Sequence, residues 1–302
     1  MSQRDIVAVV EAAYAIERDE FAWLRGILDV AGPLLDVGLG TFANSFDLTP
    51  RMRIVTRATA LSGIPDTLAP LAAQAGHEVP PDLVARFVSS VVSTMSDLWG
   101  GPAEAFEHQR YAGPALGATD FLGIVARNPT GRVVVLGAAL PQVTPTDPEL
   151  ASRWSLVAAH VAAAARLRER LGEPQAASVP ELAAATAAVD RARGELRKED
   201  ALAALRAWRP LFAERFTLLD HRDEGGGVRL RAYENAPDTP SYVELDARES
   251  RIAAFAALGH SHALVAYELG ISEKDVGDAL ASAIAKLGVR SHAELLEKLA
   301  VA

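Results

Sequence analysis

The 302-residue sequence contains no cysteine. This absence excludes disulfide bonds, thiolate zinc sites and cysteine nucleophiles, and it suits a reducing cytoplasm. Basic residues are also in the minority, because 30 lysines and arginines stand against 39 aspartates and glutamates and leave a net charge of -9. Since phosphate contacts need lysine and arginine, any contact with DNA must come from a local basic patch and not from the molecule as a whole.

Long apolar runs are missing as well. The longest candidate, residues 157–167, is interrupted by His160 and flanked by arginines. It falls short of the roughly 20 apolar residues that a membrane-spanning helix needs. Residues 1–6 lead directly into an amphipathic pattern without the apolar core of a secretion signal, so we expect a cytoplasmic protein. Half of the residues are hydrophobic, which is enough to bury the cores of two domains.

Residues 1–172 alternate between helical and strand-like patterns. We expect helices at 5–35, 63–76, 80–97 and 149–171, and strands at 35–39, 52–58, 121–127 and 132–137. Turn-rich residues at 44–50 separate the first two strands, whereas an Asn-Pro-x-Gly turn joins the last two into the clearest hairpin of the chain. This order of elements predicts an α+β, sensor-like domain.

Residues 173–244 form a connecting region. Its first part, residues 173–180, is rich in proline, alanine and serine and marks the end of the first domain. Two helices are expected at 180–194 and 198–208, followed by a second hairpin made of residues 215–221 and 228–233. We therefore describe this region as linker helices and a β-hairpin.

Residues 245–302 divide into four helical pieces. Gly259 ends the first piece, and Ser261 is placed to cap the second. A tight turn at Gly270 then leads to Ser272, which can cap a third helix, and a fourth helix follows from His292. A short helix, a turn with glycine and a capped second helix together predict a helix-turn-helix.

Several short strings in this region are similar to a known family, the LuxR-type helix-turn-helix. They are Leu245-x-x-Arg248-Glu249, Leu258-Gly259-His260-Ser261, Val265-Ala266-Tyr267-Glu268-Leu269-Gly270-Ile271-Ser272, Val276 and Lys286-Leu287-Gly288-Val289-Arg290-Ser291. The likeness extends without a gap over about 55 residues. It implies a four-helix, all-α DNA-binding domain at the end of a transcription regulator.

The resemblance also implies which residues would contact DNA, since in this family the second helix of the motif lies in the major groove. These residues are Ser272, Lys274, Val276, Lys286, Arg290 and Ser291. The helix departs from the family pattern, however, because Asp275 and Asp278 place carboxylates where phosphates would approach, and Gly277 weakens a helix interior by about 1 kcal/mol.

The charge of the terminal region leaves two interpretations open. Residues 245–302 hold six basic and eight acidic side chains, a net of -2, whereas a DNA-binding domain is expected to present a basic face. Lys274, Lys286 and Arg290 can still touch phosphate, or they can be ordinary solvated helix charges. The first interpretation gives a DNA-binding regulator, and the alternative gives a degenerate helix-turn-helix that serves protein interaction or dimerisation.

A weaker resemblance connects residues 1–172 to GAF-like sensor domains, in which the stretch from Asp120 to Pro141 is like a late hairpin. It implies a sensor that can hold a small-molecule ligand. The helix at 149–171 carries an apolar stripe of Leu150, Trp154, Val157, Val161, Ala164 and Leu167. This stripe can pack against its own sheet or against a partner subunit, and we favour a homodimer.

Catalytic and cofactor sites find little support in the sequence. Residues 38–43 match the outline of a dinucleotide fingerprint, but the turn-like residues after them offer no helix start to hold a phosphate. His260 and His262 have metal-ligand spacing without an obvious third ligand. Because no catalytic constellation is evident, we expect no enzyme, no metal and no cofactor.

Overall fold

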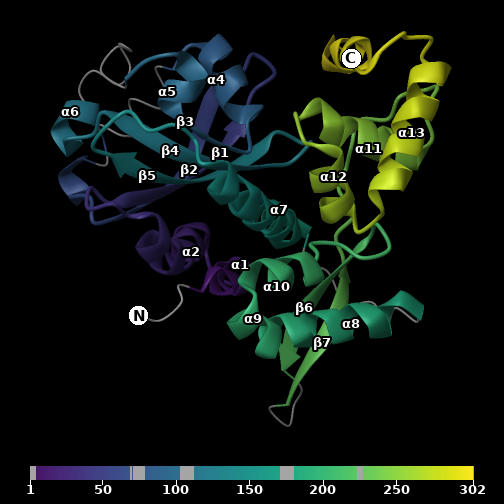
Figure 1. Ribbon diagram of the computed structural model, residues 1–302, viewed down its shortest axis with the longest axis horizontal. Helices are drawn as coiled ribbons and strands as arrows, with labels where there is room; N and C mark the ends of the chain where they lie inside the picture. The colour runs from purple at the N-terminus through teal and green to yellow at the C-terminus, as the bar shows by residue number, and fades with distance from the viewer. Residues whose placement is uncertain are drawn as a thin grey trace. The chain divides into compact units, whose positions relative to one another are not determined.

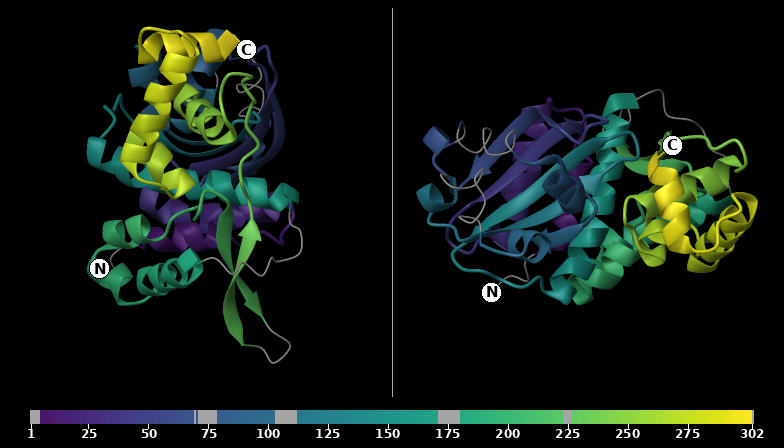
Figure 2. Two further views of the ribbon diagram at one scale, coloured as in Figure 1. Left: turned by 90° about the vertical axis from the view of Figure 1, so that its right-hand side faces the viewer. Right: turned by 90° about the horizontal axis from the view of Figure 1, so that it is seen from above.

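The computed structural model describes residues 5–68, 70, 79–102, 112–170, 180–222 and 227–301. The chain divides into two compact units. The first comprises residues 1–127 and 131–165, and the second comprises residues 128–130 and 166–302. Figures 1 and 2 show the elements of each unit along the chain.

The first unit opens with two helices, α1 (Ile6–Ala13) and α2 (Glu20–Leu35). Both begin at an aspartate whose carboxylate accepts hydrogen bonds from backbone amides of the first turn, Asp5 for α1 and Asp19 for α2. Such caps satisfy amides that have no partner within the helix. The buried Trp23 side chain of α2 donates a hydrogen bond to the Ala13 carbonyl, which fixes the two helices together.

A five-stranded sheet forms the centre of this unit. Its strands are β1 (Thr41–Leu48), β2 (Ile54–Ser62), β3 (Val92–Thr94), β4 (Asp120–Arg127) and β5 (Arg132–Leu140). The spatial order is β2-β1-β5-β4-β3, and each neighbouring pair is antiparallel. All nine residues of β5 are buried, as expected for a central strand covered on both faces.

Helices cover both faces of the sheet. On one face lie α2 and the long helix α7 (Pro148–Arg170), and on the other lie α4 (Pro81–Val88) and α5 (Met95–Trp99) (Figures 1 and 2). Two short helical segments, η1 (Asp66–Leu68) and α6 (Ala112–Leu116), complete the described part of the unit. The core under α4 consists of Phe46, Val84, Val88, Val125, Val133 and Val135.

A buried carboxylate fixes the end of the sheet next to α5. Asp120 is fully buried, and it accepts hydrogen bonds from the backbone amides of Ser96, Phe121 and Thr144 and from the Ser96 hydroxyl. A carboxylate with this many donors joins three chain segments at one point, because leaving it unpaired in the interior would cost several kcal/mol.

The second unit begins with three helices and a hairpin. These elements are α8 (Pro180–Arg193), α9 (Glu195–Glu199), α10 (Ala201–Ala207), β6 (Phe216–Arg222) and β7 (Val228–Glu234). The two strands pair antiparallel along their whole length. Arg193 joins helix and hairpin, since its guanidinium lies 4.7 Å from the centre of a Trp208 ring and 2.5 Å from an Asp220 carboxylate oxygen.

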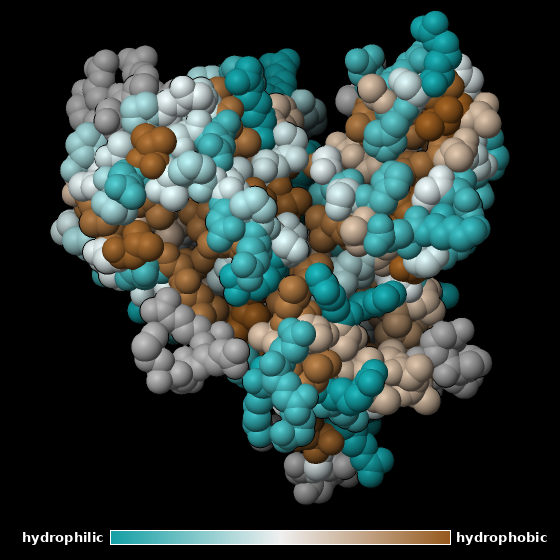
Figure 3. All heavy atoms as spheres, in the orientation of Figure 1, coloured by the Kyte–Doolittle hydropathy of each residue, from teal (hydrophilic) through white to brown (hydrophobic). Residues whose placement is uncertain are grey.

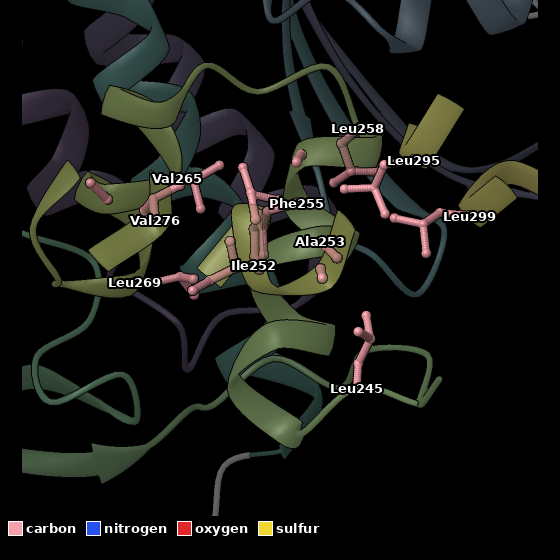
Figure 4. Packing of buried hydrophobic residues seen from close by; sticks show 14 of the residues in the cluster. Leu245, Ile252, Ala253, Phe255, Leu258, Val265, Leu269, Val276, Leu295 and Leu299 are labelled. Carbon is pink, nitrogen blue, oxygen red and sulfur yellow. The ribbon is translucent and has the colours of Figure 1, made fainter. Parts of the chain in front are cut away.

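Four further helices end the chain, namely α11 (Ala247–Ala257), α12 (His262–Leu269), α13 (Glu273–Lys286) and α14 (His292–Val301). They share one hydrophobic core, in which Ile252, Phe255, Val265, Leu269 and Val276 are fully buried. Figure 4 shows side chains from all four helices converging in this core. The four helices and the caps at Ser261 and Ser272 confirm the four helical pieces expected from the sequence.

Of the other expectations from the sequence, some are confirmed and some are wrong. The hairpin at 121–137, the long helix and the second hairpin are confirmed. The expected strand at 35–39 is wrong, and the expected turn at 44–50 is largely β1. The reason is tertiary, because β2 and β5 pair with β1 on both sides and bury its polar Ser45.

The expected helix at 80–97 is interrupted by β3, which pairs with β4. Half of the expected helix at 63–76, and all but the last residue of the segment at 173–180, lie outside the described residues. The domain boundaries after residues 172 and 244 stay predictions. Among the described residues, no helix is both long and apolar enough to cross a membrane.

Five of the six side chains of the apolar stripe of α7 are buried within the chain, and Leu150 at its start is half-buried. Trp154, Val157, Val161, Ala164 and Leu167 are each at most 4% exposed. The charged end of the helix is also partly engaged, because buried Arg166 donates a hydrogen bond to the Asn128 side chain. These side chains therefore do not form an exposed seam for a partner subunit.

A tight contact inside the sheet gives a first testable prediction. A Cβ placed on Gly137 of β5 would overlap the ring of Phe42, the residue opposite it on β1. We expect Gly137→Ala to lower the free energy of unfolding of the first unit by about 1–3 kcal/mol, because overpacking displaces a side chain from its place. Urea denaturation followed by tryptophan fluorescence measures this loss, and a variant as stable as the wild type would contradict the packing described.

Candidate nucleic-acid interface

The turn between α12 and α13 is built from caps and a glycine. The Ser261 hydroxyl accepts a hydrogen bond from the Leu264 amide at the start of α12, and Gly270 ends this helix with a left-handed φ of 69°. A side chain at Gly270 would also collide with the Leu211 backbone, so both conformation and space require glycine there.

Helix α13 starts with a capping box. The Ser272 hydroxyl accepts a hydrogen bond from the Asp275 amide, while the Asp275 carboxylate accepts one from the Ser272 amide and a second from its hydroxyl. These bonds lower the pKa of Asp275, so it stays ionised at the amino end of the helix. The acid that departs from the family pattern therefore has a structural role in starting the helix.

The two faces of α13 differ sharply. Val276, Leu280 and Ala283 are buried in the four-helix core, whereas Lys274 and Asp278 are exposed. In the space-filling view, hydrophilic residues are interspersed with apolar ones over these terminal helices (Figure 3). The helix thus presents one outward face to solvent while its inner face holds it in the unit.

The expected DNA-contact residues play several different parts. Ser272 and Ser291 cap α13 and α14, the latter by accepting a hydrogen bond from the Glu294 amide at 3.2 Å. Val276 is fully buried, so it supports the helix and offers no surface to DNA, and we remove it from the contact set. Lys274, Lys286 and Arg290 remain on the surface, each with an acidic neighbour.

Lys274 is paired within its own helix. Its ammonium lies 2.6 Å from an Asp278 carboxylate oxygen one turn later, and this hydrogen bond raises the pKa of Lys274. Because both side chains are exposed, the pair contributes little to stability. It does set the charge of this face, since the Asp278 carboxylate offsets the one positive charge on the outward face of the first turn.

Lys286 belongs to an internal network. Its ammonium lies 2.7 Å from each carboxylate oxygen of Glu249, a side chain of α11 that is only 7% exposed, and the Ser282 hydroxyl donates to the same carboxylate. Burial alone would raise the pKa of Glu249, but the bonds from Lys286, Ser282 and the Asp246 amide outweigh it and lower the pKa to about 2. Lys286 is therefore committed to holding α11 and α13 together.

The remaining basic residues of the terminal region also have partners. Arg290 lies 3.5 Å from Glu294, and Lys298 donates to the Leu287 carbonyl at 2.8 Å. On α11, Arg248 lies 2.7 Å and Arg251 3.5 Å from carboxylate oxygens of Glu214. Within the described residues from 245 onwards, every lysine and arginine thus contacts a carboxylate or a backbone carbonyl.

Two contacts of this unit were not expected from the sequence. The Tyr267 hydroxyl lies 2.6 Å from the Leu205 carbonyl and 2.7 Å from the Trp208 carbonyl, which ties α12 to the end of α10. Buried His260 lies 2.9 Å from Glu268 through Nδ1. The sequence strings that resemble the LuxR-type helix-turn-helix contain Tyr267, His260 and Glu268, but nothing in the spacing of these residues indicates their partners.

The other candidate sites have structural explanations. After Gly38 and Gly40 the chain enters β1, and both glycine amides donate to the Asp36 carboxylate that closes the turn. His262 packs edge-on against His292 on the surface, with ring centroids 5.9 Å apart. In the part of the chain that the structure describes, no three potential metal ligands gather.

Gly277 provides a test of how α13 is held. A Cβ at this position would meet nothing within 4 Å. Because glycine in a helix interior costs about 1 kcal/mol relative to alanine, Gly277→Ala should raise the free energy of unfolding of the second unit by about that amount. Urea denaturation read through Trp208 measures the change, and a destabilised variant would mean that the outer face of α13 is covered.

Glu249 predicts a specific pH dependence. Its pKa is lowered from 4.5 to about 2, so its contribution to stability is present above pH 4.5 and is lost as the pH falls towards 2. Glu249→Gln should cost about 1–3 kcal/mol at neutral pH, and the difference from the wild type should shrink over this acidic range. Exposed Glu297→Gln is the control, and a Glu249→Gln difference that does not change with pH contradicts the network.

Comparison with known proteins adds little to this geometry. No protein-family model matches the sequence, and no curated protein matches it. Among solved structures, the crystal structure of Escherichia coli SdiA is 15% identical and aligns over 87% of this chain and 81% of the SdiA chain, with a TM-score of 0.29. A likeness of this size carries no argument, so function has to be inferred from the residues of the chain itself.

Proposed function

We propose that the chain is a transcription regulator whose output module is the LuxR-type helix-turn-helix formed by α11–α14. The observation that carries this proposal is the outward face of α13, a capped helix whose inner face alone is packed. In helix-turn-helix proteins the second helix enters the major groove with its amino-terminal residues nearest the bases. The residues that would meet DNA are then Ser272, Lys274, Arg290 and Ser291, while Lys286 holds α13 against α11 through its ion pair with Glu249.

The proposal gives residues 1–172 the role of a GAF-like sensor domain. It is supported by the α+β arrangement, an antiparallel sheet with helices on both faces. We propose that this domain holds a small-molecule ligand and that the protein works as a homodimer in the cytoplasm. The contact between subunits would use a surface other than the apolar stripe of α7, because five of the six side chains of that stripe are buried within the chain.

A second candidate function is favoured by the charges. Asp275 and Asp278 lie on the first turns of α13, and the basic side chains of the module are already paired. A surface of this kind repels phosphate and suits contact with another protein. In this interpretation the helix-turn-helix fold persists as a protein-interaction or dimerisation module without sequence-specific DNA binding.

Selection from a random duplex library separates the two functions. We expect the full chain at low salt to enrich a sequence motif, and we expect Asp278→Asn to enrich the same motif with about threefold to tenfold higher affinity, because one repulsive charge is removed and Lys274 is released. Lys274→Ala should weaken binding. Fluorescence anisotropy on the enriched duplex measures the affinities.

The matched control is Glu297→Gln, which removes one exposed carboxylate from α14 and leaves α13 unchanged. Its affinity should stay close to that of the wild type. If neither the wild type nor Asp278→Asn enriches any motif, the DNA-binding function is wrong and the interaction module takes its place.

A further inference from the structure

A single carboxylate from outside the four helices holds both arginines of α11. Glu214 lies in the turn between α10 and β6, with one carboxylate oxygen 2.7 Å from Arg248 Nε and the other 3.5 Å from Arg251 Nη1. The Glu214 carbonyl accepts a further hydrogen bond from Arg251 at 3.3 Å. One carboxylate therefore pairs with two cations.

The backbone that presents Glu214 is strained. Ala213 and Glu214 have φ values of 50° and 61°, in the left-handed region that costs a residue with a side chain about 1–2 kcal/mol. Hydrogen bonds between Phe212 and Phe216 close the turn around them, one in each direction. A chain segment held in this conformation keeps the carboxylate at one fixed place over α11.

The two arginines lie beside the part of the module that would approach DNA. Arg248 Nη2 is 3.4 Å from a carboxylate oxygen of Asp275, in the first turn of α13. The amino end of the second helix is the part that enters the groove, so a cation next to it comes close to the phosphates on either side. Arg248 is 45% exposed in its side chain and Arg251 is 20% exposed.

We propose that Arg248 and Arg251 form a phosphate-contacting surface of the module and that Glu214 occupies this surface in the structure. The inference rests on the proposed function and names the two side chains that would supply the module's affinity for the DNA backbone. A phosphate of the DNA backbone replaces the Glu214 carboxylate as the partner of the arginines, so the position of the turn at 212–216 sets how strongly the module holds a polyanion.

Glu214→Gln in the full chain tests this exchange, because it removes the charge and keeps the shape of the side chain. Retention on immobilised heparin, a sulfated polyanion, should rise for Glu214→Gln. Glu214→Gly, which also suits the positive φ, should behave in the same way. On a random-sequence duplex, anisotropy titrations should show about fivefold tighter binding and a salt slope steeper by about one to two, as expected for one or two new phosphate contacts.

Two controls separate this effect from net charge and from folding. Glu297→Gln makes the same charge change on α14 and should elute from heparin with the wild type. Arg248→Ala together with Arg251→Ala in the Glu214→Gln chain should abolish the gain, while circular dichroism verifies that each variant is folded.

The result that overturns the inference is Glu214→Gln and Glu214→Gly eluting together with Glu297→Gln. The heparin assay does not depend on sequence-specific recognition. Stronger retention on heparin without any enriched DNA motif would support the arginine surface and contradict only the proposed function. An enriched DNA motif without stronger retention on heparin would support the proposed function and contradict only the arginine surface.

Discussion

The ion pair between Glu249 and Lys286 is the interaction on which the terminal module depends. Its two residues are 37 positions apart, one near the start of α11 and the other in the last turn of α13. The Glu249 carboxylate also accepts the Asp246 amide, and so completes a capping box, and it accepts the Ser282 hydroxyl. One buried charge thereby fixes the start of α11 and the orientation of α13, and every donor around it stabilises its ionised form.

Pairing of basic with acidic side chains also determines how much free positive charge the outer surface presents. A lysine that holds the fold together is not free to bind phosphate. The carboxylates of Asp278, Glu294 and Glu214 engage Lys274, Arg290 and the two arginines of α11. The module therefore combines a four-helix fold with a surface whose positive charge is masked. Masking by Glu214 differs from a simple lack of basic residues, because under the exchange proposed above a phosphate would replace this carboxylate at both arginines of α11.

The terminal module could be predicted from sequence because its signals are local. Glycines with positive φ and serine caps fall at the helix boundaries, and they are visible as residue types at fixed spacing. Strand β1 could not be predicted in this way, since Asn44, Ser45 and Asp47 resemble a turn. Pairing on both sides and the contacts of Asp47 with Arg57 and Arg132 override this local preference.

In the candidate interface, too, local features could be predicted from the sequence and long-range contacts could not. The exposed positions on α13 follow from its helical period, as does the acidic character of its first turns. The partners of the basic residues do not, because Glu214 lies 34 residues before Arg248 in the chain and only the folded unit brings them together. Val276 is the opposite case, because the resemblance placed it among the DNA contacts although a local signal was present. Its apolar side chain stands four residues before Leu280 on the same helical face, and both side chains are buried.

Amide hydrogen exchange of the full chain with and without duplex DNA tests the central claim most directly. If α13 and the start of α11 form the contact surface, DNA should slow exchange at residues 246–251 and 272–278 and leave the strands of the first unit unchanged. Unchanged exchange in both segments at a DNA concentration that saturates binding would contradict the account, because the bound surface would then lie elsewhere.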